Sequence, residues 1–560
     1  MNPKLNKILV ISLILLIIFG IAIRLFSLQK DITSDETDFV KAAKAIQETG
    51  HPLFYHSEQQ PSELALWHPP MYIYLLSLAL NSSFPEISAR SINAIFSVFT
   101  AVLIFLFCIN LIDSRHKKII GLSAAALFLI NYFILSSSVL IDIDVLSMFF
   151  MLAFIFFILM DFKKQNPWYF ALAAASLFFG IFNRYPIAFL VFVALGVYYL
   201  INKDLRKSFM RYFLVGLLAG IAFLLVWGFY STFMEPGTFF SFIIHNAALG
   251  SENLSSIGTY IGSFMLNISQ LIRLFTLPAI ILMLLSFSYF LRRKEKPIKI
   301  LLIYSLSILL LFTFISRPAF GYPRYFLTMF PAIIILISLF VYENLKGQAI
   351  DKKMFLLAVI SFAISLCLLI ILHPQSTFYE SNGLIKATNL PDFIFNLFAS
   401  FPLFFAFFFR DKRKIAAIFI LLALVLSYSL YFDLVFVNHE SNIKEAGTYL
   451  KEHTNASDVI ICPKAVGYYA ERKFWVNDFT KPPMNNLSAQ FLFAYFKKSL
   501  ENRNMNDEFF WEKGYFGGIN PPQPTQETLN SAKYVVLYHP VDARVPENTI
   551  GDFYIYRLND

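Results

Sequence analysis

The sequence predicts an all-α polytopic membrane protein that carries a small α/β domain at its C-terminal end. Hydrophobic residues make up 57% of the 560 residues, and the mean hydropathy is +0.60. The apolar residues fall in runs of about 16–25, the length that a helix needs to cross roughly 30 Å of hydrocarbon. After residue 437 the composition changes, and short β-type runs alternate with Pro- and Asn-rich stretches. These observations indicate a helical membrane domain followed by a soluble one.

About thirteen apolar runs are predicted to span the membrane. The first run lacks a small-residue cleavage motif, so a retained helix is favoured over a signal peptide. The predicted spans are residues 8–26, 88–111, 119–139, 144–160, 168–182, 186–201, 212–230, 274–291, 300–316, 325–342, 354–372, 394–409 and 415–436.

The distribution of basic residues predicts the orientation of the chain. Lysine and arginine concentrate in alternate short loops, such as 115–118, 203–211 and 292–294. By the positive-inside rule these loops and the N-terminus are cytoplasmic, and an odd number of spans places the C-terminal domain outside the cell membrane. The same bias explains the net charge of +9 without a nucleic-acid partner. Membrane lipids are the expected surroundings.

Two domains follow from this pattern, residues 1–436 in the membrane and residues 437–560 outside it. In the outer domain, Ser441–His453 is expected to be a helix. Strands are expected at Asp458–Cys462, Tyr534–Tyr538 and Phe553–Tyr556.

The first outer loop, residues 29–87, is predicted to contain two surface helices. Thr37–Thr49 is amphipathic, and Met71–Leu80 is apolar but too short to span. The apolar stripe of the first helix consists of Phe39, Val40, Ala43 and Ile46.

Carboxylates at outer helix ends are the first candidate site residues. Asp35, Glu36 and Asp38 follow the first span, and Asp142 and Asp144 open the fourth. A charged side chain beside a bilayer costs free energy unless water solvates it or an opposite charge pairs with it, so such a residue is a candidate for a functional role. Asp142 and Asp144 could bind a divalent cation through hard oxygen ligands. The alternative for both groups is helix capping by solvated carboxylates.

Several motifs occur in one order on the predicted outer side, and together they resemble a known enzyme class. They are Asp35-Glu36, His68-Pro69-Pro70, Arg90, Asp144, and Arg324-Tyr325 followed by Pro331. This order resembles the membrane glycosyltransferases of the GT-C class, especially the protein O-mannosyltransferases and the lipid A aminoarabinose transferases. The resemblance implies a GT-C fold and a polyprenyl-phosphate sugar donor.

The resemblance also implies roles for individual residues. Asp35 matches the proposed catalytic base, Glu36 is expected to orient its neighbours, and Asp144 belongs to the wall of the active site. The expected donor-phosphate ligands are Arg324, Tyr325, Arg90, His68, Arg184 and His245.

Each of these ligands has a plainer alternative. Arginines at helix ends can snorkel to headgroups, and tyrosines there are common aromatic-belt residues. His68 stands where the aminoarabinose transferases carry a lysine, and its Pro-Pro neighbours can simply start a helix. His245 can be structural.

The function expected from these features is inverting glycosyl transfer at the outer face. A sugar would move from a polyprenyl-phosphate donor to a hydroxyl or phosphate of a lipid, protein or glycan acceptor; the sugar and the acceptor stay open. The alternative is a transporter or lipid flippase, and a third reading is a membrane-anchored assembly protein. Transporters place polar groups near the bilayer midplane. Here the charged candidates gather at one surface, which favours surface chemistry.

Overall fold

The computed structural model describes the following parts of the chain, and all structural statements concern them. They are residues 3–25, 28, 31–32, 34–55, 61–64, 69–202, 206–234, 276–293, 295–315, 323–345, 356–357, 359–360, 362–363, 397–403, 405–406, 409, 412–429, 442–476, 532–537, 545–551 and 553–558. The predicted span 354–372 lies largely outside these residues.

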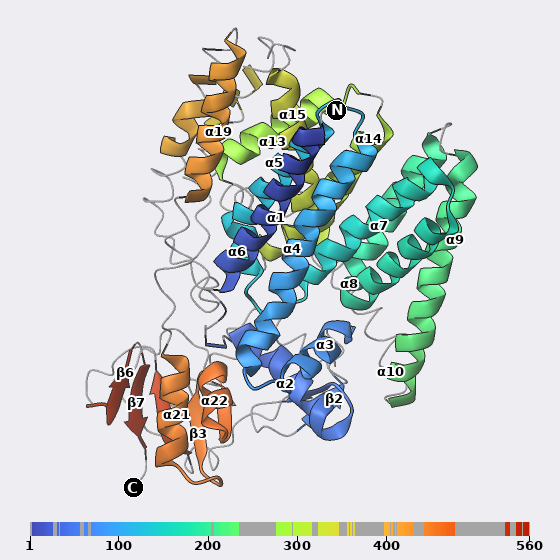
Figure 1. The fold of residues 1–560 in the computed structure, drawn as a ribbon. Helices are drawn as coiled ribbons and strands as arrows, with labels where there is room; N and C mark the ends of the chain where they lie inside the picture. The colour runs from blue at the N-terminus through green and yellow to red at the C-terminus, as the bar shows by residue number, and fades with distance from the viewer. Residues whose placement is uncertain are drawn as a thin grey trace.

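The described part before residue 430 is mostly helical (Figure 1). Among the described residues, six helices are long and apolar enough to cross a membrane, judged by length and composition, so the chain is an integral membrane protein. These six lie in α1, α4, α7, α8, the continuous run from α9 to α10, and η3 with α15. The helices of this bundle are α1 (Pro3–Leu25), α4 (Pro85–Leu111), α5 (Lys117–Ile130), α6 (Tyr132–Ser137), α7 (Asp144–Lys164), α8 (Pro167–Ile201), α9 (Arg206–Phe223), a π-helical turn η1 (Leu224–Gly228), α10 (Phe229–Met234), α13 (Leu277–Phe290), α14 (Lys296–Ile315), a 3₁₀-helix η3 (Pro323–Met329), α15 (Phe330–Leu345) and α19 (Arg413–Ser429). The total of about thirteen spans stays a prediction.

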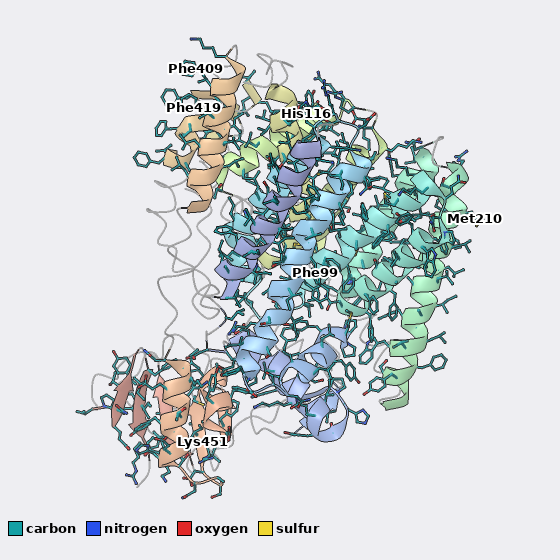
Figure 2. The ribbon with its side chains drawn as sticks, in the orientation of Figure 1. Phe99, His116, Met210, Phe409, Phe419 and Lys451 are labelled. Carbon is teal, nitrogen blue, oxygen red and sulfur yellow. The ribbon has the colours of Figure 1, made fainter. Side chains whose placement is uncertain are left out.

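The helices of the bundle differ in how much of their apolar surface is buried. Helix α7 is buried along most of its length between α4 and α8, and it also contacts η3. By contrast, α1 exposes a row of large apolar side chains, as do parts of α4 and α9, where Phe99 and Met210 lie at the surface (Figure 2). Exposed apolar side chains on spanning helices are suited to contact with lipid.

Helix α8 reverses direction at Arg184. The backbone there has φ −152° and ψ 79°, outside the helical region. A Cβ atom on Gly180 would lie 3.7 Å from Cβ of Ala188, whereas eight residues of straight helix span about 12 Å. Pro186 begins the second arm, where its missing N–H costs no helical hydrogen bond.

The two ends of α8 therefore lie at the same end of the bundle. In the first arm, the ring centroid of Phe170 lies 5.3 Å from Cζ of Arg211 in α9. Tyr199 in the second arm stacks on the neighbouring Tyr212, with 4.7 Å between ring centroids. The predicted spans 168–182 and 186–201 correspond to these two arms.

The segment between α1 and α4, predicted to be the first outer loop, contains two packed helices and a short hairpin. Helix α2 (Ser34–Thr49) buries Phe39, Val40 and Ala43 against α3 (Met71–Ala79). This confirms the predicted apolar stripe and both predicted helices. Between the helices, β1 (Leu53–Tyr55) pairs antiparallel with β2 (Pro61–Leu64).

Residues 442–476, 532–537, 545–551 and 553–558 form a five-stranded sheet with two helices, called here the C-terminal unit. The strand order is β4-β3-β5-β7-β6, in which β4, β3 and β5 are parallel and the other pairs are antiparallel. Both helices contribute to one apolar core with the sheet. The elements are α21 (Ile443–His453), β3 (Val459–Cys462), α22 (Lys464–Ala470), β4 (Lys473–Val476), β5 (Ala532–Leu537), β6 (Asn548–Ile550) and β7 (Phe553–Arg557). Strands and a helix lie at the predicted positions in β3, β5, β7 and α21; α22, β4 and β6 are additional.

Candidate functional site

Five predicted site residues have described side chains that lie in or beside the connection between α6 and α7, residues 138–143: Glu36, Arg90, Asp142, Asp144 and Arg184. This connection is buried, and a buried backbone must have its N–H and C=O groups satisfied. Side chains from α2, α4 and α8 provide the partners. The site is thus built around a loop whose position is fixed from three sides.

Glu36 and Arg90 form the first of these supports. Arg90 Nη1 donates to Oε1 of Glu36 at 2.5 Å, and Nη2 donates to Oε2 at 2.8 Å. Both side chains are buried, with exposed fractions of 1% for Arg90 and 3% for Glu36. A bidentate charge-assisted pair of this kind is among the strong hydrogen-bonded contacts in proteins.

The same two side chains also bind backbone groups. Glu36 Oε1 accepts from the N–H of Ile141 at 2.8 Å. Arg90 donates to the carbonyl oxygens of Val139 and Asp31, both at 2.7 Å. A phosphate would have to displace these partners from the terminal nitrogens of Arg90. The geometry therefore supports a positioning role for Arg90, and phosphate binding by it stays a prediction.

Asn93, one turn beyond Arg90 on α4, supports the next part of the connection. Its Nδ2 donates to the carbonyl oxygens of Leu140 and Asp142, each at 2.6 Å. The carboxylate of Asp142 accepts from the N–H of Ile143 at 2.6 Å. Burial, with the carboxylates of Asp142 and Glu36 nearby, raises the pKa of Tyr72 on α3, so its phenol stays neutral.

The bend of α8 provides the third support. Asn183 Nδ2 donates to the carbonyl oxygen of Ile143 and to Oγ of Ser147, both at 2.7 Å. The next residue, Arg184, forms a buried ion pair with Asp144 at the start of α7. The reversal of α8 thus brings the predicted residues Asp144 and Arg184 together, although they come from different helices.

The described residues do not by themselves form a metal site. Among them, no group of three or more His, Cys, Asp or Glu side chains could hold a metal ion. Asp144 already faces the positive charge of Arg184, which a cation would have to displace. The cation expected at Asp142 and Asp144 stays a prediction.

The remaining predicted residues are described only in part. Asp35 lies in the first turn of α2, and its side chain lies outside the described residues, as do those of Arg324 and Tyr325 in η3. Helix η3 packs against α7, the helix that Asp144 opens. His68 and His245 lie wholly outside the described residues.

Sequence reasoning missed Asn93 and Asn183. Both are fully buried amides next to a predicted arginine, at i+3 and i−1. A buried amide must find hydrogen-bond partners, so a polar side chain inside an apolar run and close to a charged one is a usable signal.

Comparison with known proteins gives a family match for part of the chain and a fold match for most of it. Residues 67–228 match the family model described as dolichyl-phosphate-mannose-protein mannosyltransferase. No curated protein sequence matches the chain.

Solved structures extend the likeness to the fold as a whole. ArnT from Cupriavidus metallidurans bound to undecaprenyl phosphate has a TM-score of 0.57 and 14% identity, covering 85% of this chain and 86% of ArnT. The apo form of the same enzyme has a TM-score of 0.55 and 14% identity, covering 94% and 92%. The resemblance to GT-C membrane glycosyltransferases is therefore confirmed: residues 67–228 match the mannosyltransferase family model, and the chain has the fold of ArnT.

Proposed function

We propose that the chain is a membrane glycosyltransferase that moves a sugar from a polyprenyl-phosphate donor to an acceptor hydroxyl or phosphate at the outer face. The observation that carries this proposal is the family match over residues 67–228. That segment includes Arg90, Asp142, Asp144 and Arg184, which support or border the buried connection before α7. ArnT, whose fold the chain shares, is solved with undecaprenyl phosphate, a lipid of the proposed donor class.

In the proposed reaction Asp35 is the base. Its carboxylate takes the acceptor proton while the acceptor oxygen attacks C1 of the sugar. The bond from C1 to the phosphate oxygen breaks, and its electron pair stays on the departing polyprenyl phosphate. A single displacement of this kind inverts the anomeric centre.

The other residues divide into three proposed groups. Arg324, Tyr325, His68 and His245 are candidates for stabilising the charge that develops on the phosphate. Glu36 and Arg90 instead hold α2 and the connection in place. Asp144 and Arg184, which form an ion pair, are proposed to form the wall on the α7 side.

The organisation of the chain is part of the same proposal. Residues 1–436 would be the membrane domain, with the N-terminus in the cytoplasm, and residues 437–560 an outer domain that helps to admit the acceptor. The orientation rests on the distribution of basic loops.

The test offers the purified protein a panel of polyprenyl-phosphate sugars and measures donor turnover with an acceptor extract. We expect Asp35→Asn to lose more than about 99% of the transfer, because an amide cannot accept the proton. Asp38→Asn, one turn further along α2, is the matched control and should keep wild-type activity. Full transfer by Asp35→Asn would overturn the mechanism.

Two further arms separate the alternatives. Movement of the lipid across reconstituted vesicles without any sugar transfer would support a flippase instead. Addition of EDTA tests the cation: loss of transfer that Mg²⁺ or Mn²⁺ restores would support the prediction for Asp142 and Asp144, and unchanged transfer would refute it.

A further inference from the structure

The C-terminal unit contacts the membrane part at the segment that leads into α2. Tyr469 on α22 donates from its hydroxyl to Oε1 of Glu86 at 2.9 Å and accepts from the N–H of Ile32 at 2.9 Å. Lys444, in the first turn of α21, donates from its backbone N–H to Oδ2 of Asp31 at 3.0 Å. Its side chain lies 3.2 Å from Glu86. Helix α22 lies beside α2, and α21 packs on the other side of α22 (Figure 1).

The segment at Asp31 and Ile32 is therefore held from two opposite sides. The carbonyl oxygen of Asp31 accepts from Arg90, while the N–H of the next residue is bound by Tyr469. Helix α2 begins at Ser34, and Asp35 is its second residue. The carbonyl of Asp31 and the N–H of Ile32 thus fix the position from which α2 starts.

Glu86 and Arg90 lie one turn apart at the start of α4. Glu86 accepts from Tyr469, whereas Arg90 holds Glu36 beside Asp35. One rigid helix end therefore links the C-terminal unit to the first turn of α2.

The contact made by Tyr469 is more specific than the others at this surface. The Lys444–Glu86 pair is 55% and 24% exposed, and such pairs contribute little. Lys41 and Lys44 on α2 lie over the rings of Phe474 and Tyr468 at 4.2 and 4.4 Å, which adds attraction without fixing a backbone position.

The phenol of Tyr469 is suited to this double contact. Burial raises its pKa, and the Glu86 carboxylate acts in the same direction. The hydroxyl therefore stays protonated and can donate to Glu86 while it accepts from Ile32. The close approach of α21 supports α22 from behind, since a Cβ on Gly447 would lie only 2.8 Å from the carbonyl oxygen of Val466.

We propose that Tyr469 is a positioning residue for the proposed base: its hydrogen bonds to Ile32 and Glu86 hold the start of α2, and hence Asp35, in its reactive place. The proposal rests on the proposed function. The C-terminal unit then completes the site from a distance of more than 400 residues in the sequence.

Tyr469→Phe tests this by removing one hydroxyl. We expect kcat for sugar transfer to fall roughly ten- to hundredfold, the scale on which small misplacements of reacting groups act. The KM for the polyprenyl-phosphate sugar should stay within about twofold, because donor binding is not changed. An unchanged kcat, or a rise in KM that accounts for the whole loss, would overturn the proposal.

Two matched variants isolate the hydroxyl. Tyr468→Phe removes the hydroxyl of the adjacent tyrosine and should leave kcat unchanged. Glu86→Gln keeps an acceptor for Tyr469 but removes the ion pair with Lys444, so kcat should fall by less than about threefold. An equal fall of kcat in Tyr469→Phe and Tyr468→Phe would show a general effect on the C-terminal unit and would overturn the specific role of the Tyr469 hydroxyl.

Hydrogen–deuterium exchange separates this inference from the proposed function. In Tyr469→Phe the N–H of Ile32 loses its acceptor, so exchange in the peptide covering residues 31–36 should become faster. Unchanged exchange there overturns the positioning role whatever the activity. If the wild-type protein transfers no sugar from any donor, the proposed function fails, and exchange still decides whether Tyr469 holds this segment.

Discussion

The two buried arginine–carboxylate pairs of the site, Glu36–Arg90 and Asp144–Arg184, are supported in different ways. Arg90 joins α4 to α2 and also binds the carbonyl oxygens of Val139 and Asp31. Its removal would break all four of these hydrogen bonds at once. Asp144–Arg184 joins α7 to the bend of α8, where the neighbouring Asn183 makes separate hydrogen bonds to the same region.

This difference suggests a division between support and chemistry. A buried ion pair adds little net stability, but loss of one partner is costly because a charge is left buried and uncompensated. Arg90 makes four hydrogen bonds, two to the Glu36 carboxylate and two to backbone carbonyl oxygens. Because Asn183 also holds the bend, we expect loss of Arg184 to cost less stability than loss of Arg90.

Arg90→Met should have the largest effect on stability. It leaves the Glu36 carboxylate buried without its cation and removes the donors to two backbone carbonyls. We expect the free energy of unfolding to fall by about 3–5 kcal/mol, measured by chemical or thermal unfolding of the detergent-solubilised protein.

The double variant Glu36→Gln with Arg90→Met is the control. With the buried charge also removed, part of the lost stability should return. A wild-type unfolding midpoint for Arg90→Met would contradict the support role and reopen phosphate binding by this side chain.

Arg184→Gln should destabilise the protein less, by about 2 kcal/mol, because Asn183 still ties the bend to α7 and a neutral amide replaces the cation. Transfer should fall by more than the change in stability explains, since Asp144 then lacks its counter-charge in the wall of the proposed site. The same unfolding assay and the donor-turnover assay check both parts. A stability loss equal to that of Arg90→Met would remove the distinction between the two pairs.

The acids and arginines of the site could be predicted from the sequence, because charges beside apolar runs are conspicuous. Their partners could not. Glu36 meets Arg90 across 54 positions, and Asp144 meets Arg184 only because α8 reverses. Such pairings depend on how helices pack, and a single sequence carries no direct record of that packing.

The fold shows the same limit. The break at residues 183–186 predicts two spans, and the two arms of α8 meet there at the non-helical Arg184, but the sequence does not tell which side chains of the two arms face each other. In the C-terminal unit, strands rich in β-branched or aromatic residues are predicted. The edge strand β6 (Asn548–Ile550) has three residues, too few for a period to be recognised. The edge strand β4 (Lys473–Val476) is as long as the predicted β3, and its aromatic residues are a usable signal.

Glu343→Gln should have the smallest effect of the three, and it calibrates the comparison. Its partner Arg293 is 32% exposed and Glu343 is 21% exposed, in contrast to the almost fully buried pairs of the site. Water solvates both charges when the pair is broken, so we expect a loss below about 1 kcal/mol. The loss should shrink further at 1 M salt, because exposed charges are screened. A loss of unfolding free energy as large as that of Arg90→Met would show that burial does not set the cost of breaking these ion pairs. It would also show that the backbone contacts of Arg90 do not make its loss more costly than that of an exposed partner.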